Sequence, residues 1–162
     1  MGVQPGTVAA GGEGHHLILA VGERVVAFPI ARILELIRMV AISPLPDAPE
    51  WIPGVINLRG TLVPVVDLRK RFGISAEPCG LETPIAIFES RDRLVGAIAD
   101  AAVEVAAATE ESLVAPDELM GDEHPLVAIM QHEGGSVPVL DVDRVCAGIE
   151  LLSLPEVDGH AA

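Results

Sequence analysis

Hydrophobic and polar positions alternate along the chain in short runs that end at turn residues. Residues 17–30, LILAVGERVVAFPI, contain two apolar runs separated by Gly-Glu, which predicts a strand, a tight turn and a second strand. Three later segments have the same form and predict three more hairpins, namely residues 55–68 around Arg-Gly, 84–100 around Ser-Arg-Asp, and 126–142 around Glu-Gly-Gly. We therefore expect a chain built mainly of short β-strands.

The second pair of hairpins repeats the first pair. The segments VPVVDL and VPVLDV align at an offset of 74 residues, which matches Pro64 with Pro138 and Asp67 with Asp141. Self-similarity over this length is typical of two copies of one structural unit. The sequence therefore predicts two copies of a small β unit.

Proline and aspartate recur inside the strand-like runs of both copies. Proline has no N–H to donate to a neighbouring strand, so Pro64 and Pro138 are expected at an edge or at a barrel corner. An aspartate at the end of a strand can accept backbone N–H groups of a following helical turn, so Asp67 and Asp141 are expected to be structural caps. The alternative is an acid–base pair of these two carboxylates in a cleft between the lobes, as in a small hydrolase or lyase.

The segment IARILELIRMV, residues 30–40, allows two interpretations. Its apolar residues have helical spacing and, taken alone, predict a helix. Its LEL sequence also matches VEV at residues 103–105 with an offset of 69, and that copy is rich in β-forming residues. This match favours a short turn followed by a strand.

Composition and charge restrict the class of protein. Half of the 162 residues are apolar and only 2% are aromatic, so the core must be aliphatic. The net charge of −14 opposes binding to nucleic acid or to an anionic membrane. Residues 1–71 contain seven basic and six acidic side chains, whereas residues 72–162 contain three and eighteen. This asymmetry fits two faces for different partners, or simply an acidic solvated surface.

Several features favour a cytoplasmic protein. The N-terminal sequence lacks the apolar core of a secretory signal, and the apolar runs are too short to insert directly into a membrane. The only cysteines, Cys79 and Cys146, are too few for a disulfide framework, and neither has a nearby histidine to activate it. We expect both thiols to be inert.

Candidate catalytic and metal-binding groups are few. The chain contains no P-loop, no GxGxxG after a strand, and no GxSxG, HExxH or CxxC motif. His15 and His16 are adjacent and can in principle bind a metal, but they lie in a glycine-rich segment. His124, His132 and His160 have no spacing that places them on one face of a regular element. We therefore expect no catalytic residue, no metal and no cofactor.

Arg59 is the most distinctive polar residue. It lies at the tip of a predicted hairpin, directly before Gly60, with Arg69, Lys70 and Arg71 following closely. A guanidinium in this position suits a bidentate contact to a carboxylate or to backbone carbonyls, although a turn residue pointing into water is the simpler alternative. A duplicated β unit without catalytic groups favours a binding protein.

The segment WIPGVINLRGTLVPVVDLRKRFG, residues 51–73, resembles the motif of the CheW-like chemotaxis coupling proteins, and the resemblance extends over about residues 15–150. It implies an all-β fold of two tandem SH3-like five-stranded β-barrels packed together, with only short helical turns. The approximate lobes are residues 15–78 and 79–150, between a flexible N-terminal tail (1–14) and a C-terminal tail (151–162). The resemblance also implies a strand at LELI.

This resemblance implies a non-enzymatic adaptor that couples chemoreceptors to the histidine kinase CheA. The partners it implies are the receptor's cytoplasmic tip, in a groove between the barrels, and the regulatory domain of CheA. The adaptor would then be cytoplasmic and recruited to membrane receptor arrays. The implied receptor-binding residues are Ile33, Glu35, Gly54, Arg59 and Gly60.

Two further interpretations stay open. Glu35 carries a charge opposite to that of Arg59, so the two side chains can instead pair with each other inside the protein. A generic SH3-like module that binds proline-rich peptides is the least favoured function, because such grooves are lined with aromatic side chains and this chain has almost none.

Overall fold

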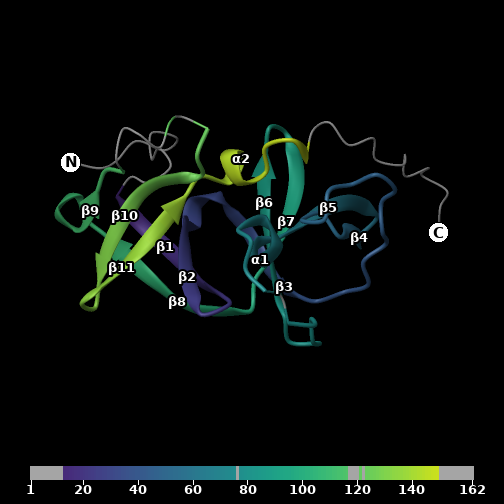
Figure 1. Cartoon of the computed structure of the whole chain (residues 1–162), viewed down its shortest axis with the longest axis horizontal. Coiled ribbons are helices and arrows are strands. Elements are labelled where there is room, and N and C mark those ends of the chain that lie inside the picture. The colour runs from purple at the N-terminus through teal and green to yellow at the C-terminus, as the bar shows by residue number, and fades with distance from the viewer. Residues whose placement is uncertain (1–12, 76, 117–120, 122, 150–162) are drawn as a thin grey trace.

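The computed structural model describes residues 13–75, 77–116, 121 and 123–149, and strands dominate this part of the chain (Figure 1). Its helices are single turns, namely α1 (Leu68–Arg71), α2 (Val142–Val145) and the 3₁₀ turns η1 (Ile30–Arg32) and η2 (Glu110–Ser112). Among the described residues no helix has the length and apolar character needed to cross a bilayer. The predicted all-β class with only short helical turns is confirmed.

The strands form two sheets. The six-stranded sheet has the order β8-β1-β2-β11-β10-β9, and the five-stranded sheet has the order β3-β6-β7-β5-β4. The first comprises β1 (Gly14–Val21), β2 (Arg24–Pro29), β8 (Ala101–Ala108), β9 (Leu113–Val114), β10 (Leu126–His132) and β11 (Gly135–Leu140). The second comprises β3 (Ile33–Arg38), β4 (Gly54–Leu58), β5 (Thr61–Asp67), β6 (Pro84–Ser90) and β7 (Arg93–Ile98). All four predicted hairpins are present, as β1–β2, β4–β5, β6–β7 and β10–β11.

The two sheets do not follow the expected lobes at residues 15–78 and 79–150. Strands β3 to β7 form one sheet, and they are inserted in the chain between β2 and β8 of the other. Each repeat thus gives its first hairpin to the sheet of the other repeat, through the parallel pairs β2–β11 and β5–β7. Local patterns cannot show this exchange, because these pairs join strands far apart in the sequence. The six-stranded sheet has one strand more than expected because the two-residue β9 pairs with β10.

Pro64 and Pro138 do not lie in edge strands. Strand β5 lies between β7 and β4, and β11 lies between β2 and β10. In each case the parallel pairing begins one residue after the proline. Val55, opposite Pro64, exchanges both backbone hydrogen bonds with Ser43 at 2.8 Å each, so Pro64 is not needed as a donor to β4. The edge-strand alternative of the prediction is therefore wrong, and each proline lies directly before the start of a parallel strand pairing.

The helix considered for residues 30–40 is wrong. The chain makes the single turn η1 and then strand β3, which pairs antiparallel with β6. Half-buried and exposed side chains alternate along β3, as they do along a strand with one covered face. Pairing with β6 overrides the helical spacing, as both the internal repeat and the family resemblance indicated.

Three apolar clusters show how the sheets pack. The largest lies between the two sheets, where the rings of Phe28 in β2 and Phe88 in β6 have centroids 5.0 Å apart at an interplanar angle of 55°. A second cluster surrounds Met130 within the six-stranded sheet, and a third surrounds Ile56 within the five-stranded sheet. Two small β units, each with its own core, are thus packed together through a third core.

His16 in β1 is a polar residue in this apolar interior, with no exposed surface. Its Nδ1 donates a hydrogen bond to the carbonyl of Gly14 at 3.0 Å, and its Nε2 has no partner among the described residues. Burial lowers the pKa of His16 below its ordinary value. The folded protein therefore holds this imidazole neutral.

We expect His16 to make the fold less stable in mild acid. As the pH falls below about 6.5, the unfolded chain binds a proton at His16 that the folded chain does not, so the free energy of unfolding should fall by up to about 1.4 kcal/mol per pH unit. Urea unfolding at pH 7.5 and pH 5.5 should show a smaller decrease for His16→Leu than for the wild type. His15→Leu, at the exposed neighbouring position, is the control, and equal pH dependence in all three proteins would contradict the prediction.

Candidate functional site

Arg59 and Glu35 form an ion pair between the two edges of the five-stranded sheet. Strands β3 and β4 are the two edges of this sheet, with Glu35 in β3 and Arg59 in the turn that joins β4 to β5. Nη1 of Arg59 donates to Oε1 of Glu35 at 3.2 Å, and Nη2 donates to Oε2. The pair is therefore bidentate and links the two edges of the sheet. This is the internal pairing that the sequence left as an alternative.

The hairpin turn fixes the position of Arg59. Arg59 and Gly60 have φ angles of 51° and 90°, and a two-residue hairpin turn of type I′ needs positive φ at both central residues. The backbone N–H of Gly60 also donates to Oδ1 of Asn57 at 2.7 Å. The Arg59 side chain is 69% exposed, so the N–H groups that Glu35 does not use remain accessible to a partner.

Each member of this pair stabilises the charged form of the other. The hydrogen bond from Arg59 lowers the pKa of Glu35, and the hydrogen bond to Glu35 raises the pKa of Arg59. Both groups are therefore charged at neutral pH. The pair presents a fixed polar feature at the margin of the sheet.

Ile33 and Gly54, the other two residues implied to bind the receptor, make packing contacts inside the protein. Ile33 is half-buried and packs against the core between the sheets. Gly54 makes room for the segment before β4, because a Cβ on it would lie 2.0 Å from the carbonyl oxygen of Ser43. The structure thus brings Glu35, Arg59 and Gly60 together at one surface and gives Ile33 and Gly54 packing contacts.

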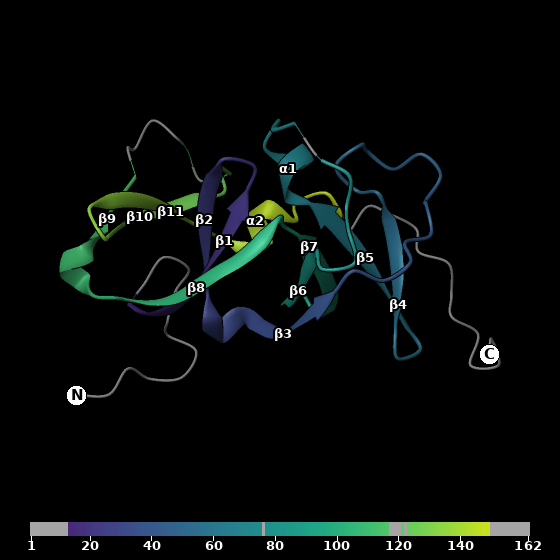
Figure 2. The same cartoon turned by 90° about the horizontal axis from the view of Figure 1, so that it is seen from below.

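An exposed apolar surface runs along two edge strands that belong to different sheets. Leu34 and Leu36 in β3 and Val103 and Val105 in β8 are each 44–54% exposed, and we call them the β3–β8 surface. Leu36 and the first residues of β8 line one shallow pocket, so the end of β3 and the start of β8 border the same hollow; Figure 2 shows both strands from below. Large apolar side chains gathered on neighbouring strands are typical of a docking site.

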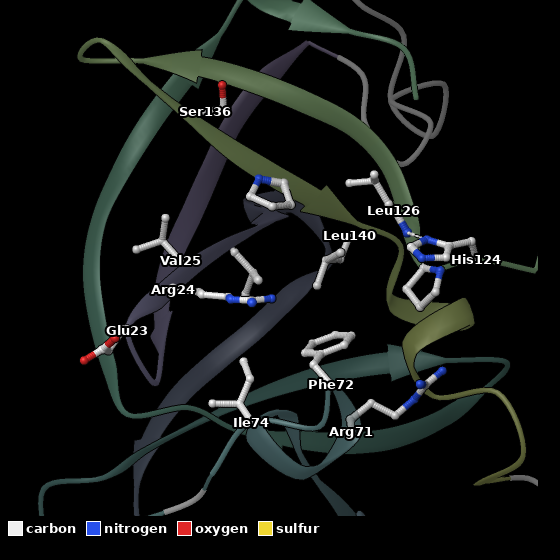
Figure 3. Close-up of a pocket in the computed structure, with 13 residues that line it drawn as sticks. Glu23, Arg24, Val25, Arg71, Phe72, Ile74, His124, Leu126, Ser136 and Leu140 are labelled. Carbon is white, nitrogen blue, oxygen red and sulfur yellow. Dashed lines mark hydrogen bonds between the residues drawn. The ribbon is translucent and has the colours of Figure 1, made fainter. Parts of the chain in front are cut away.

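A larger cavity, of about 760 Å³, lies between the hairpins of the six-stranded sheet and the end of α1 (Figure 3). Its wall is mostly apolar and includes Phe72, Ile74 and Leu140, with the cationic side chains of Arg24 and Arg71 beside them. Asp67 and Asp141 are not among its lining residues. The cavity is a second concave surface that contains no residue of β3 or β8.

Asp67 and Asp141 act as helix caps. Oδ1 of Asp67 accepts the backbone N–H of Arg69 at 3.0 Å, and Oδ1 of Asp141 accepts that of Asp143 at 3.3 Å. Each carboxylate also pairs with an arginine, Asp67 with Arg69 at 3.0 Å and Asp141 with Arg144 at 3.4 Å. No contact in the described part of the chain favours the acid–base alternative.

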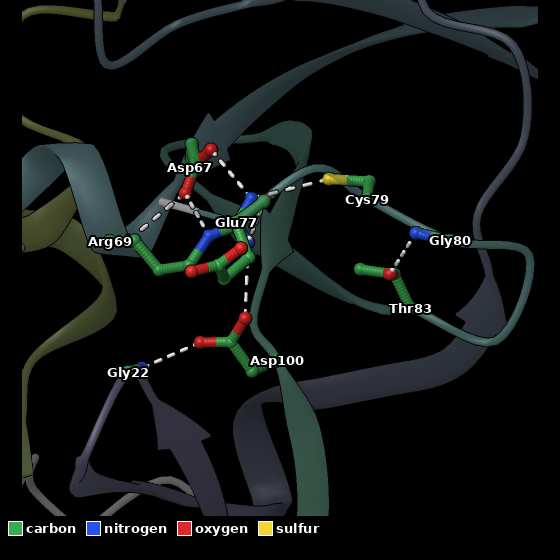
Figure 4. Close-up of polar contacts among 8 residues, drawn as sticks. All are labelled: Gly22, Asp67, Arg69, Glu77, Cys79, Gly80, Thr83 and Asp100. Carbon is green, nitrogen blue, oxygen red and sulfur yellow. Dashed lines mark hydrogen bonds and ion pairs between the residues drawn. The ribbon is translucent and has the colours of Figure 1, made fainter. Parts of the chain in front are cut away.

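Arg69 is the centre of a polar cluster that the sequence did not predict (Figure 4). Its side chain is only 3% exposed, and Nε and Nη2 donate to the two oxygens of Asp67 at 3.0 Å each. Nη1 donates to Oδ1 of Asp100 at 3.0 Å and to the carbonyl of Glu77 at 2.7 Å. Oδ2 of Asp100 accepts the N–H of Gly22, in the β1–β2 turn, at 2.6 Å. We call this the Arg69 bridge, because it connects the five-stranded sheet with the six-stranded sheet.

Asp143 makes a second connection between the sheets, at the position that the offset of 74 aligns with Arg69. It accepts hydrogen bonds from Ser90 Oγ at 2.7 Å and from Arg32 Nη2 at 3.2 Å. Burial by itself raises the pKa of Asp143, but these hydrogen bonds outweigh it and lower the pKa below its ordinary value. We call this connection the Asp143 bridge.

The remaining thiols and histidines are dispersed. Cys146 is buried, and burial raises the pKa of its thiol to about 12, which agrees with the expected inert thiol. Cys79 is exposed, with Sγ 3.2 Å from Nη2 of Arg69. His15 and His16 lie in strand β1, and His160 lies outside the described residues.

Comparison with known proteins agrees with these observations. The family model described as CheW-like domain matches residues 15–150. The chain is 27% identical over 126 residues to chemotaxis protein CheW of Helicobacter pylori, covering 77% of this chain and 76% of that protein. It is 29% identical over 129 residues to chemotaxis protein CheW of Thermotoga maritima, covering 80% and 85%. The solved structure of scaffolding protein TtCheW from Thermoanaerobacter tengcongensis superimposes with a TM-score of 0.76 at 28% identity, covering 83% of this chain and 93% of that one.

Proposed function

The chain belongs to the family of CheW-like domains, and from this premise we propose that it is a non-enzymatic adaptor that couples chemoreceptors to the histidine kinase CheA. Its relatives are named as chemotaxis proteins, and the solved neighbour is named as a scaffolding protein. An adaptor needs separate docking surfaces for its partners. The structure offers such surfaces and only internally paired carboxylates among the candidate catalytic groups of its described residues.

The β3–β8 surface is the observation that carries this proposal. The cytoplasmic tip of a chemoreceptor is a helical hairpin, and an amphipathic helix binds by laying its apolar face into an apolar groove. Leu34, Leu36, Val103 and Val105 supply the apolar groups. Glu35 lies on the opposite face of β3 from Leu34 and Leu36, so the exposed Arg59 that it holds supplies the polar contact that sets the orientation of such a helix.

The regulatory domain of CheA requires a different surface. The β3–β8 surface uses one edge strand of each sheet, so the opposite parts of both sheets remain accessible when it is occupied. The cavity beside Phe72 is one such surface, with apolar walls and two arginines. With both partners bound, the adaptor would lie in the cytoplasm at a membrane receptor array.

The proposal predicts that Leu36→Asp and Arg59→Ala each weaken binding of a chemoreceptor cytoplasmic fragment about tenfold, which is about 1.4 kcal/mol. A buried aspartate would lose its hydration, and loss of Arg59 would free Glu35 and remove the accessible N–H groups. Binding of the CheA regulatory domain and the melting temperature should stay close to wild type. Isothermal titration calorimetry with both fragments, at low and high salt, measures this, and the effect of Arg59→Ala should shrink as salt rises.

Matched control variants distinguish an effect of the β3–β8 surface on receptor binding from a general effect of changed charge. Leu81→Asp replaces another exposed leucine, 85% exposed, outside β3 and β8. Arg24→Ala removes an arginine that lines the separate cavity. Neither should change receptor binding. If the wild type binds neither fragment, the adaptor function is wrong, whereas full receptor affinity in both test variants would reject only this surface.

A further inference from the structure

Three metal-ligating side chains meet where the edge strand β8 approaches the end of β10 in the six-stranded sheet. Glu104 lies in the edge strand β8, His132 is the last residue of β10, and Glu133 begins the β10–β11 turn. Nε2 of His132 lies 3.1 Å from Oε1 of Glu104 and 3.8 Å from Oε1 of Glu133. One ligand atom from each of the three residues lies within 4.8 Å of the other two. The fold of the six-stranded sheet thus brings Glu104 and His132, 28 positions apart in the sequence, within contact distance of each other.

The internal repeat shows what is unusual about this cluster. The offset of 69 matches Glu104 with Glu35, and the offset of 74 matches Glu133 with Arg59. In the five-stranded sheet the carboxylate of Glu35 therefore pairs with the guanidinium of Arg59 between the two edges of the sheet. In the six-stranded sheet a carboxylate occupies the position of the guanidinium, and the imidazole of His132 is the group that faces the two carboxylates among the residues that the structure describes.

The cluster has a deficit of positive charge. Among the described residues, the ion pairs of Glu104 and Glu133 involve His132 alone. Two carboxylates beside one imidazole leave a net negative charge whether the imidazole is neutral or protonated. A bound cation would supply the charge that Arg59 supplies in the other sheet.

We propose that Glu104, His132 and Glu133 form a binding site for zinc or a similar divalent transition-metal ion. Zinc binds histidine nitrogen and carboxylate oxygen at about 2.0–2.2 Å, and ligands of a tetrahedral ion at that distance lie about 3.4 Å apart. The separations of 3.1 and 3.8 Å fall on either side of this value. An imidazole ligand favours zinc, copper or nickel over magnesium and calcium, and three protein ligands leave a position for water.

An ion at this site would hold β8 against the β10–β11 hairpin. Glu104 lies between Val103 and Val105, the two residues that β8 contributes to the β3–β8 surface. The bound ion would therefore fix the strand that carries half of that surface. The metal site itself does not depend on the proposed adaptor function.

The experiment is titration of the full, untagged chain with Zn²⁺ by isothermal titration calorimetry in a buffer without chelators. The wild type should bind one ion, and His132→Gln or Glu104→Gln should weaken binding at least about tenfold, since even loss of an outer-sphere partner costs a metal site that much. His124→Gln and His15→Gln are matched controls and should change the affinity less than twofold. Zn²⁺ should raise the melting temperature of the wild type and of both controls, but not that of His132→Gln.

Each other result rejects the site. A wild type that binds no Zn²⁺ overturns the proposal, and so does an affinity of His132→Gln within twofold of wild type. Loss of binding in His15→Gln would place the ion at the N-terminal histidines instead. Circular dichroism of both ligand variants without metal establishes that they are folded, and Glu104→Gln, at an exposed position, keeps the test decisive if His132→Gln is unstable.

Discussion

Replacing Arg69 with alanine should lower the free energy of unfolding by about 3–5 kcal/mol. The guanidinium is 3% exposed and binds both oxygens of Asp67, whose side chain is 5% exposed. Without it, the Asp67 carboxylate would lose its charged partner, the Glu77 carbonyl its donor, and Asp100 its link to α1. A buried charge left without its partner is one of the largest single losses that a point substitution causes. Urea denaturation at pH 7 measures the change.

Arg144→Ala is the matched control for this prediction. Arg144 pairs with the cap Asp141, as Arg69 pairs with the cap Asp67, but its side chain is 33% exposed and the distance is 3.4 Å. Water screens such a pair, so we expect a loss of less than about 1 kcal/mol. Equal losses for the two variants would mean that the Arg69 bridge contributes no more than a surface ion pair.

Gly54→Ala should be the second most damaging substitution and should lower the free energy of unfolding by at least about 2 kcal/mol. A Cβ at Gly54 would lie 2.0 Å from the carbonyl oxygen of Ser43 and 2.9 Å from Cα of Pro44, so the backbone before β4 must move. Overpacking of this kind costs about 1–3 kcal/mol, and the φ angle of 155° adds backbone strain. Moving this segment would also break the two hydrogen bonds between Ser43 and Val55. Thermal and urea denaturation of the variant measure the loss.

Gly60→Ala separates strain from steric overlap. Gly60 also has a positive φ, 90°, but nothing lies within 4 Å of the position of an added Cβ. Gly60→Ala should therefore lower the free energy of unfolding by less than Gly54→Ala does. If Gly54→Ala is as stable as wild type and yet fails to bind a receptor fragment, Gly54 contacts the partner directly and its packing role is secondary.

The predictable part of this fold is the part that neighbouring residues determine. Alternating runs and turn residues identify all four hairpins, and aspartates at strand ends identify both caps. The exchange of hairpins between the repeats escaped prediction, because the parallel pairs β2–β11 and β5–β7 depend on strands far apart in the chain. Family resemblance supplied the two packed units but not this arrangement of the strands.

The candidate site shows the same limit. Arg59 was identifiable from its place before a glycine in a hairpin, and its pairing with Glu35 was one of two stated alternatives. The burial of Arg69 was not identifiable, because Arg69, Lys70 and Arg71 are adjacent basic residues and only the distant Asp100 and Glu77 distinguish the first. The exposure of Leu34 and Leu36 was also hidden, since an apolar residue in an edge strand has the same pattern whether another element covers it or not.

The insertion of strands β3 to β7 between β2 and β8 means that the backbone crosses between the two units twice, at η1 and at Ala99-Asp100. Both crossings are clamped, the first because Arg32 of η1 donates to Asp143, and the second because Asp100 accepts from Arg69. A pair of domains joined by one free linker can swing apart. Two units joined by two connecting segments, each held by an ion pair, have no such hinge. The molecule should therefore move as a rigid body, so that a displacement imposed by a partner on one unit reaches the other undiminished.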